Sequence, residues 1–347
     1  MTFERPLLEV DDLHVSFPIR QGLFQRTAGE VRAVNGVSFK VRRGTSFGLV
    51  GESGCGKTTV ARAVLRLVEP SDGAILFDNK DVSRMDAAAM QQFRGRVQAV
   101  FQDPFSSLNP RMSIGRIIGE PIRVHGLKPD SEVRSEVLRL LDICGLPGRF
   151  ADLYPHEMSG GQRQRVGIAR ALAMNPELIV CDEAVSALDV SIQAQIINLL
   201  EELQKELGLT YLFIGHDLSV VRHICDDVAV MYLGRIAETA ASDELFATPR
   251  HPYTQALIDA VPNPDPDVEA DRVIEPLQGE VPSPANLPSG CLFHPRCPIA
   301  TSRCRQEAPS LEKAAPAHAV ACWEAGSSQQ AALTSSPKKT ISQGAAP

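Results

Sequence analysis

The sequence predicts an α/β fold in which the strands of a parallel sheet alternate with helices. Four short, nearly continuous apolar runs support this, because buried parallel strands read as unbroken apolar segments. Each run ends in residues suited to bind a ligand, and open α/β sheets bind ligands beyond the carboxyl ends of their strands. The runs, each with the residues that follow it, are Ser46–Val50 (Gly51), Val97–Phe101 (Gln102), Leu178–Cys181 (Asp182, Glu183) and Tyr211–Ile214 (Gly215, His216).

Composition is that of a globular protein with no membrane span. Of 347 residues, 44% are apolar and 22% charged, and no run of 18 apolar residues is present. The net charge of −7 argues against a free-standing nucleic-acid binder, so we expect no nucleic-acid partner. The N-terminus carries Glu4 and Arg5 and no apolar signal region follows, so we expect a cytosolic protein with reduced thiols.

The first apolar run leads into Gly51–Thr58, which fits the pattern G-x4-G-K-S/T. Glycines in this pattern let backbone N–H groups turn inward around phosphates, Lys57 reaches the β- and γ-phosphates, and Thr58 ligates Mg²⁺. A helix is predicted to follow from Thr59, and its N-terminus favours anions. The residues expected to contact the nucleotide are Gly51, Ser53, Gly54, Cys55, Gly56, Lys57, Thr58 and Thr59.

The acidic pair Asp182–Glu183 follows the third apolar run. Asp182 would hold Mg²⁺, and Glu183 would polarise the attacking water. An acidic pair at a strand end is otherwise commonly a helix cap or a solvated turn, but the phosphate loop at the same sheet edge favours the catalytic interpretation. Gln102 and His216 are weaker signals singly, because either could be an ordinary polar residue at a strand end.

The segment Ser159–Gln162 precedes a helical stretch over Val166–Leu172. Ser159 and the glycines after it lie where a helix begins, so they can offer N–H and hydroxyl donors to a phosphate. A flexible loop would explain the glycines but not their place among the other motifs.

The order of these motifs resembles that of the ABC ATPases. The phosphate loop, Gln102, Ser159–Gln162, Asp182–Glu183, Ser186–Asp189 and His216 follow one another in this order. The resemblance implies a P-loop ABC ATPase core with an antiparallel edge sheet and an inserted helical subdomain over about residues 114–172. It also implies two ATPase domains packed head to tail, with each ATP held between the phosphate loop of one chain and the signature motif of the other.

The resemblance also implies roles for single residues. Ser159 and Gly161, within the motif Ser159, Gly160, Gly161 and Gln162, would contact ATP bound by the partner chain. Asp189 would connect the two sites, His216 would hold the γ-phosphate and the attacking water, and Gln102 would touch Mg²⁺. Phe17, near the end of the first strand, is the candidate for stacking on adenine. Phe24 is its rival, and a plain core role for Phe17 is the alternative.

Longer segments narrow the resemblance to ATP-binding subunits of dipeptide and oligopeptide ABC importers. They are Gln102–Pro110, Ser186–Ser191, His251–Thr254 and the cysteine-bearing end, and the likeness covers roughly residues 6 to 325. Ala184 and Gly215 depart from the usual pattern, since Pro is common at the first position and Ser or Thr at the second.

This resemblance implies ATP hydrolysis that drives peptide import at the cytoplasmic face of the inner membrane. It implies as partners two transmembrane permease subunits, a second ABC ATPase subunit and, indirectly, an extracytoplasmic substrate-binding protein. The second ATPase subunit is expected to be a paralogue, with an identical chain as the alternative. Nickel and glutathione importers share this type of ATPase, so they remain alternatives. A non-transport ABC ATPase is the alternative of another class. The DNA-repair type needs a long coiled coil between phosphate loop and signature, but only about 100 residues without sustained heptads separate Gly56 from Ser159.

We expect the ATPase domain to occupy residues 6–260. A C-terminal extension is expected over residues 261–324, followed by a disordered tail over residues 325–347. Eight cysteines are present. Cys55, Cys144, Cys181 and Cys225 are scattered through the ATPase and read as small buried or loop residues. The extension carries the other four, Cys291, Cys297, Cys304 and Cys322.

The four late cysteines leave several ligands open. A reducing compartment disfavours disulfides, and the spacing C-x5-C-x6-C-x17-C lacks the tight pairs of most structural zinc sites. An iron–sulfur cluster tolerates wider spacing, and members of the resembled subfamily carry a [4Fe-4S] cluster here. Zinc and unligated thiols remain alternatives. Since the segment lies outside the ATP motifs, we expect it to have a structural or docking role.

Overall fold

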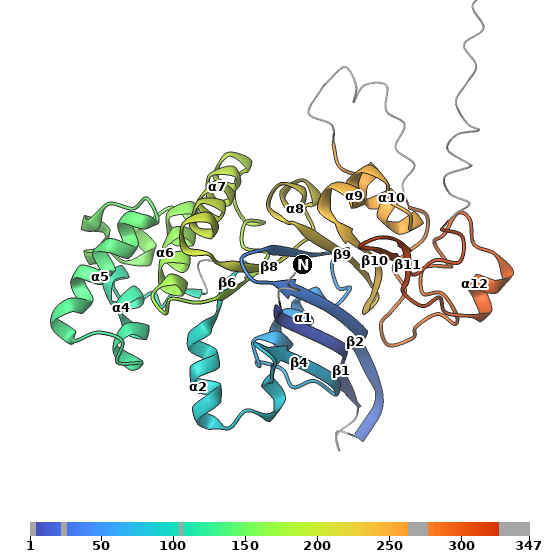
Figure 1. The fold of residues 1–347 in the computed structure, drawn as a ribbon, viewed down its shortest axis with the longest axis horizontal. Coiled ribbons are helices and arrows are strands. Elements are labelled where there is room, and N and C mark those ends of the chain that lie inside the picture. Colours follow the sequence, from blue (N-terminus) through green and yellow to red (C-terminus); the bar gives the residue numbers. More distant parts are fainter. Residues whose placement is uncertain (1–4, 22–25, 104–106, 263–276, 326–347) are drawn as a thin grey trace, which may run out of the picture.

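The computed structural model describes residues 5–21, 26–103, 107–262 and 277–325, which form an α/β fold (Figure 1). Within them, a mixed eight-stranded sheet runs through the molecule, and a four-stranded antiparallel sheet lies beside it. Helices cover the main sheet, which confirms the fold class predicted from the apolar runs.

The main sheet has the strand order β11-β12-β10-β9-β3-β8-β7-β6. Its strands are β3 (Ser46–Val50), β6 (Val97–Phe101), β7 (Leu178–Asp182), β8 (Thr210–Gly215), β9 (Asp227–Tyr232), β10 (Arg235–Ala241), β11 (Glu312–Ala315) and β12 (His318–Val320). The five strands β9, β3, β8, β7 and β6 pair in parallel, whereas β10, β12 and β11 continue the sheet antiparallel. All four strands predicted from the sequence are therefore present and adjacent.

The parallel strands read as continuous apolar runs because they are buried on both faces. In β8, Tyr211 and Phe213 belong to the core on one side of the sheet, and Leu212 and Ile214 belong to the core on the other side. Successive side chains of a strand point to opposite faces, so burial of both faces leaves no polar position.

The second sheet is the antiparallel edge that the resemblance implied. It has the order β2-β1-β4-β5 and consists of β1 (Pro6–Gln21), β2 (Arg26–Arg42), β4 (Asp72–Phe77) and β5 (Lys80–Asp81). Buried residues of this sheet, such as Leu8, Val37 and Phe77, share one core with Val60 and Val64 of the helix after the phosphate loop. The edge sheet thus packs directly onto the phosphate-binding part of the molecule.

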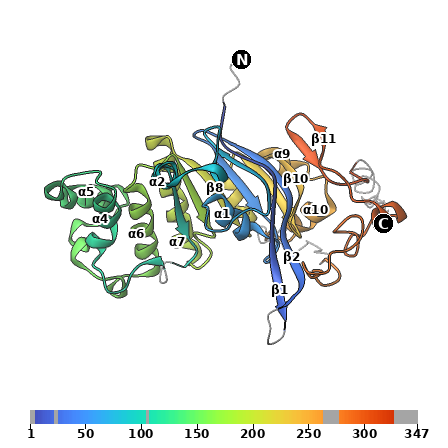
Figure 2. The same cartoon turned by 90° about the horizontal axis from the view of Figure 1, so that it is seen from below.

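The helices of the described residues follow the strands along the chain. They are α1 (Lys57–Val64), α2 (Ala87–Arg96), α4 (Ile114–Val124), α5 (Asp130–Ile143), α6 (Gly160–Leu172), α7 (Val190–Leu207), α8 (Leu218–Ile224), α9 (Ser242–Ala247), α10 (Pro252–Asp259) and α12 (Ser302–Gln306), with short 3-10 turns η1 (Val82–Arg84), η2 (Gly148–Asp152) and η3 (Pro155–Glu157). Helices α4, α5 and α6 gather at one end of the molecule (Figures 1 and 2). Ile114, Ile118 and Ile122 of α4 are buried at helical spacing and belong to one core with Val133 and Val137 of α5.

The cysteine-bearing extension lies at the opposite end from α4 and α5 (Figure 2). The sequence indicated no strands here, but β12 pairs with β10 and β11 pairs with β12, so the extension adds two strands to the main sheet. A buried contact anchors this addition, because His318 Nε2 lies 2.7 Å from Glu238 Oε1 on β10. The predicted disordered tail, apart from Ala325, lies outside the described residues. None of the helices in the described ranges combines the length and the apolar character that crossing a bilayer requires.

Candidate nucleotide site

The phosphate loop connects β3 to α1 at the carboxyl edge of the main sheet. Gly51 and Gly56 have φ of 149° and 108°, which side chains rarely adopt. A Cβ atom at Gly51 would lie 2.2 Å from the carbonyl oxygen of Met231, and one at Gly56 would lie 2.2 Å from that of Ala33. Only glycine fits at these two positions, which explains the pattern read from the sequence.

Lys57 begins α1, and its side chain is buried against the loop. Its Nζ donates hydrogen bonds to the carbonyl oxygens of Gly51 (2.7 Å) and Glu52 (2.9 Å). The first N–H groups of a helix have no partner inside it, so the start of α1 adds donors suited to a phosphate. A cavity of about 180 Å³ lies over the loop. It is lined by Val31, Ala33, Ser53, Gly54, Gly56, Lys57, Thr58, Thr59, Glu183 and Pro284.

Two of the residues predicted to hold Mg²⁺, Thr58 and Asp182, meet at this edge, and the third, Gln102, contacts Glu183. Thr58 Oγ1 lies 3.3 Å from Asp182 Oδ1, and Gln102 Nε2 donates to Glu183 Oε2 at 2.8 Å. Hydroxyl and carboxylate oxygens are ligands that Mg²⁺ prefers, so the donor set fits this ion. Burial raises the pKa of Asp182, while the bond from Thr58 lowers it. A cation placed here would offset the cost of that burial.

Glu183 lies where the cavity over the phosphate loop meets a second small cavity that His216 also lines. Its Oε1 is 3.5 Å from His216 Nδ1, so the structure brings the predicted catalytic pair together. The Glu183 backbone has φ of 48°, in the left-handed region, and its N–H donates to the carbonyl of Ile214 at 2.8 Å. Backbone strain of this kind concentrates at functional sites.

The signature motif lies at the start of α6, as the sequence predicted. Ser159 is the N-cap residue: its Oγ accepts from the N–H of Gln162 at 3.4 Å, and Gln162 Oε1 accepts from the N–H of Ser159 at 2.9 Å. Both Ser159 and Asp189, the N-cap residue of α7, are exposed. Among the described residues, the lining of the cavity over the phosphate loop includes no member of the motif. The structure thus keeps the signature apart from the phosphate loop of its own chain.

The adenine candidate Phe17 lies on β1 and is 41% exposed. Phe17 pairs with Val31 of β2, and Val31 lines the cavity over the phosphate loop. Directly paired residues project from the same face of a sheet, so Phe17 lies on the face that borders this cavity. Its rival Phe24 falls outside the described residues.

The four late cysteines line one small cavity of about 10 Å³. Burial, and to a lesser extent the neighbouring thiols, raise the pKa of Cys291, Cys297 and Cys322, that of Cys322 to about 12. Backbone N–H groups, including those of Phe293 and Glu324, donate to these sulfurs. Within the described ranges, no three His, Cys, Asp or Glu side chains form a group that could hold a metal ion. The four early cysteines are buried, as predicted.

One functional contact escaped the sequence analysis, which placed the extension outside the ATP motifs. Arg296 of the cysteine-bearing segment donates to both carboxylate oxygens of Glu52, at 2.6 and 3.0 Å. Glu52 is the second residue of the phosphate loop, and its N–H donates to the hydroxyl of Tyr253 at 2.8 Å. Arg296 and Glu52 are 244 positions apart, so no local pattern signals their contact.

A phosphate loop and an acidic pair on one sheet, with an edge sheet on one side and a helical signature region on the other, define an ABC-type ATPase. Comparison with known proteins agrees. The ABC transporter family model matches residues 34–186, and that of the oligopeptide/dipeptide transporter C-terminal region matches residues 237–304.

Relatives and solved structures extend this match. The oligopeptide transport ATP-binding protein AppF of Bacillus subtilis is 54% identical over 92% of this chain and 97% of its own length. OppF of Salmonella typhimurium, another oligopeptide transport ATP-binding protein, is 51% identical over 91% of this chain and 95% of its own. The chain therefore belongs to the ATP-binding proteins of oligopeptide and dipeptide ABC transporters, and it is an ATPase.

Two solved structures share the fold of the ATPase part. A subunit of the cbiONQ ABC transporter complex of Clostridium perfringens aligns with a TM-score of 0.61 and 32% identity, over 70% of this chain and 92% of its own. An ATP-binding cassette solved as a dimer in a post-hydrolysis state with ADP and phosphate aligns with a TM-score of 0.60 and 27% identity. That match covers 68% of this chain and 98% of the cassette.

Proposed function

We propose that the chain hydrolyses ATP to power the import of di- and oligopeptides through a membrane ABC transporter. It would bind, at the cytoplasmic face of the membrane, two transmembrane permease subunits and a second ATPase subunit, a paralogue. An extracytoplasmic binding protein would deliver the peptide to the permeases. The observation that carries this proposal is the similarity, over nearly the whole chain, to two proteins named for oligopeptide transport.

Reconstitution with oligopeptide permease subunits tests the proposal. ATP hydrolysis in liposomes should rise when a peptide-loaded binding protein is added, and Lys57→Ala should abolish the rise, since Lys57 binds the phosphates. Stimulation by nickel- or glutathione-loaded binding protein alone would reassign the cargo. Failure to co-purify with any membrane subunit would contradict a transport role.

In the ATP site, the phosphate loop and Lys57 would bind the β- and γ-phosphates, and Thr58, Gln102 and Asp182 would hold Mg²⁺. Bound Mg²⁺ supplies charge neutralisation at the phosphates. Glu183 would accept a proton from the attacking water, and His216 would hold the γ-phosphate and that water. The support is geometric: Thr58 lies 3.3 Å from Asp182, and Glu183 lies 2.8 Å from Gln102 and 3.5 Å from His216.

The signature residues Ser159, Gly160, Gly161 and Gln162 would serve the ATP that the partner subunit binds, and Asp189 would connect the two sites. Ser159 and Asp189 are exposed and do not line the cavity over their own phosphate loop, which supports a role across an interface. Phe17 would stack on adenine.

The proposed domains are the ATPase domain over residues 6–260 and the extension over residues 261–324. The ATPase domain would include a helical subdomain over about residues 114–172.

The cysteine-bearing extension would carry a [4Fe-4S] cluster on Cys291, Cys297, Cys304 and Cys322. The support is that all four cysteines line one cavity and that backbone N–H groups donate to three of them, Cys291, Cys297 and Cys322, a contact that tunes such clusters. In such a cluster each thiolate would bind a different iron.

Anaerobic purification should yield a brown protein with about four iron and four sulfide per chain. The Cys297→Ser variant should lack the colour, and its extension should be cleaved faster by proteases. Its phosphate loop should still bind ATP. The matched control is Cys144→Ser, because Cys144 is also buried but lies in the helical region, far along the chain from the four late cysteines. Stoichiometric zinc without iron in anaerobic protein would rule the cluster out.

A further inference from the structure

The C-terminal region holds the phosphate loop at Glu52. The carboxylate of Glu52 binds Arg296, and its backbone N–H binds the Tyr253 hydroxyl. Both partners lie within residues 237–304, which match the model of the oligopeptide/dipeptide transporter C-terminal region. We infer that Arg296 is a positioning residue for nucleotide binding, which fixes the phosphate loop through Glu52 in the conformation that accepts ATP.

The contact between Arg296 and Glu52 restricts the position of the Glu52 side chain. Two guanidinium nitrogens meet two carboxylate oxygens, and such bidentate pairs are both strong and restricted in geometry. The Arg296 side chain is 6% exposed and that of Glu52 is 27% exposed. The bond to Glu52 raises the pKa of Arg296, so its charge is permanent. Removal of either partner would leave the other charge partly buried and unpaired, which costs far more than an exposed pair.

Glu52 is held through three of its groups, and one of these contacts leads directly to the phosphates. Its carbonyl oxygen accepts from Nζ of Lys57, the side chain that binds the β- and γ-phosphates. A shift of Glu52 would therefore move both the N–H groups of the loop and the resting position of Lys57. Glu183 and His216 follow other strands, β7 and β8. The effect should fall on ATP binding and leave the chemical step intact.

The same contact ties the phosphate loop to the cysteine segment. Arg296 directly precedes Cys297, and its guanidinium lies 6.0 Å from the Tyr232 ring centre. The rings of Tyr232, Tyr253 and Phe293 pack with centroids 4.7 to 5.4 Å apart. These residues link β9, α10 and the cysteine segment behind Glu52. Order in the cysteine segment is thus transmitted to the phosphate loop through a packed cluster.

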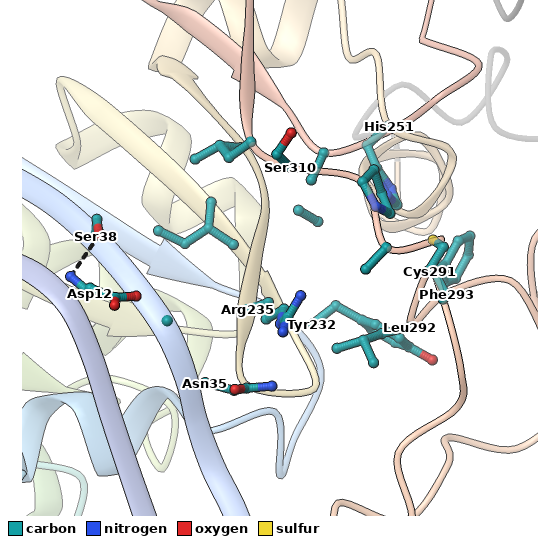
Figure 3. A pocket seen from close by; sticks show the side chains of 18 of the residues that line it. Asp12, Asn35, Ser38, Tyr232, Arg235, His251, Cys291, Leu292, Phe293 and Ser310 are labelled. Carbon is teal, nitrogen blue, oxygen red and sulfur yellow. Dashed lines mark hydrogen bonds between the residues drawn. The ribbon is translucent and has the colours of Figure 1, made fainter. Parts of the chain in front are cut away.

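A cavity beside the cysteine segment bears on the importance of the contact between Arg296 and Glu52. A space of about 480 Å³ separates the cysteine segment from the edge sheet. Figure 3 shows Cys291 and Phe293 on one side of it and Asp12 and Ser38 on the other. Described residues of the extension and of the edge sheet line opposite sides of this cavity, so at this boundary Arg296 and Tyr253 provide the contacts to the phosphate loop.

Steady-state kinetics of the full chain in its assembled transporter test the inference. Arg296→Ala should raise the KM for ATP about tenfold, the scale of one lost charge-assisted hydrogen bond, with kcat within about twofold. Arg305→Ala is the matched control, because Arg305 flanks Cys304 as Arg296 flanks Cys297 but is exposed. The control should leave both constants unchanged. Equal KM values for the two variants would overturn the inference.

A double-mutant cycle separates positioning from mere folding of the extension. Glu52→Ala alone should raise the KM for ATP as Arg296→Ala does, and adding Arg296→Ala to Glu52→Ala should cost nothing more. Arg296→Lys, which keeps the charge but not the bidentate geometry, should give an intermediate KM. Additive losses, or a normal KM in Glu52→Ala, would show that Arg296 does not act through the loop. Glu52→Ala also keeps the test decisive if Arg296→Ala fails to fold.

Discussion

Glu183 is held in a backbone conformation that glutamate seldom adopts, and its neighbours show how. Its N–H binds the carbonyl of Ile214, while its own carbonyl accepts from both the N–H and the hydroxyl of Ser186, at 3.1 and 3.0 Å. The next residue is Ala184, which is buried and lacks the ring restraint of a proline. Hydrogen bonds from neighbouring segments therefore supply the stiffness of this loop.

Glu183→Gln should reduce ATP turnover about 10²- to 10⁴-fold, because the amide cannot take a proton from water. ATP binding should persist, since the amide oxygen can still accept from Gln102. Turnover would be measured as phosphate release by the assembled transporter, and binding by titration with Mg-ATP. Glu206→Gln, the same change on the exposed end of α7, is the control. Normal phosphate release by Glu183→Gln would remove Glu183 from the mechanism.

At the scale of elements, buried polar side chains join the extension to the core. Glu238 of β10 is fully buried, and its carboxylate accepts from the N–H groups of Arg250 (2.7 Å) and His251 (3.0 Å) and contacts His318 of β12. His251 is the N-cap residue of α10, and its Nδ1 accepts from the N–H of Tyr253 at 3.0 Å. One carboxylate thus fixes the start of α10 and the added strand together.

His251 makes this junction sensitive to acid. Burial lowers its pKa to about 4, below the ordinary 6.5, so the unfolded chain binds more protons between these values. Stability should therefore fall as the pH drops from 6.5 toward 4, by roughly 3 kcal/mol if the full shift applies. His251→Asn keeps a cap acceptor without the titration. Urea unfolding at pH 7 and 5 should show a smaller loss for the variant than for the natural chain. An identical loss would exclude His251 as the cause.

Elements differ in how well local sequence predicts them. The strand Tyr211–Ile214 can be predicted from the sequence because its burial on both faces of the sheet leaves an unbroken apolar run. Glu312–Ala315 and His318–Val320 do not, because they are short, partly exposed, and paired through a register that a distant residue, Glu238, fixes. Propensity over a few residues carries little weight against such tertiary pairing.

Residues of the candidate site also differ in how well the local sequence predicts them. Lys57, Asp182 and His216 could be placed at one edge from the sequence because each lies at or beyond the carboxyl end of a parallel strand, and parallel strands bring these ends together. Arg296 could not, because it lies in a proline-rich loop whose local pattern fits a plain turn as well as a contact. Only the packing of the extension onto β10 and α10 places its guanidinium on Glu52.

At the scale of the whole molecule, the two parts of the proposed ATP site, the phosphate loop and the signature motif, lie apart in the part of the chain that the structure describes. Helix α6 lies with α4 and α5 at one end, while α1 lies under the centre of the main sheet (Figure 1). Gly161 packs closely against α7, since a Cβ atom there would lie 2.5 Å from the Ile192 side chain. A signature that does not line the cavity over its own phosphate loop favours pairing with a second subunit.

Ser159→Arg therefore should spare Mg-ATP binding by the isolated chain but block ATP-driven closure of the subunit pair. The added side chain would occupy the exposed start of α6, where the partner's γ-phosphate would dock. Closure would be followed by cross-linking across the interface in a Glu183→Gln background, which holds ATP unhydrolysed. Ser135→Arg places the same cation on an exposed position of α5 and should close normally. Loss of the Ser159 cap costs about 1 kcal/mol of helix stability, so a thermal melt separates unfolding from blocked closure. If Ser159→Arg closes as Ser135→Arg does, the signature does not act across the interface.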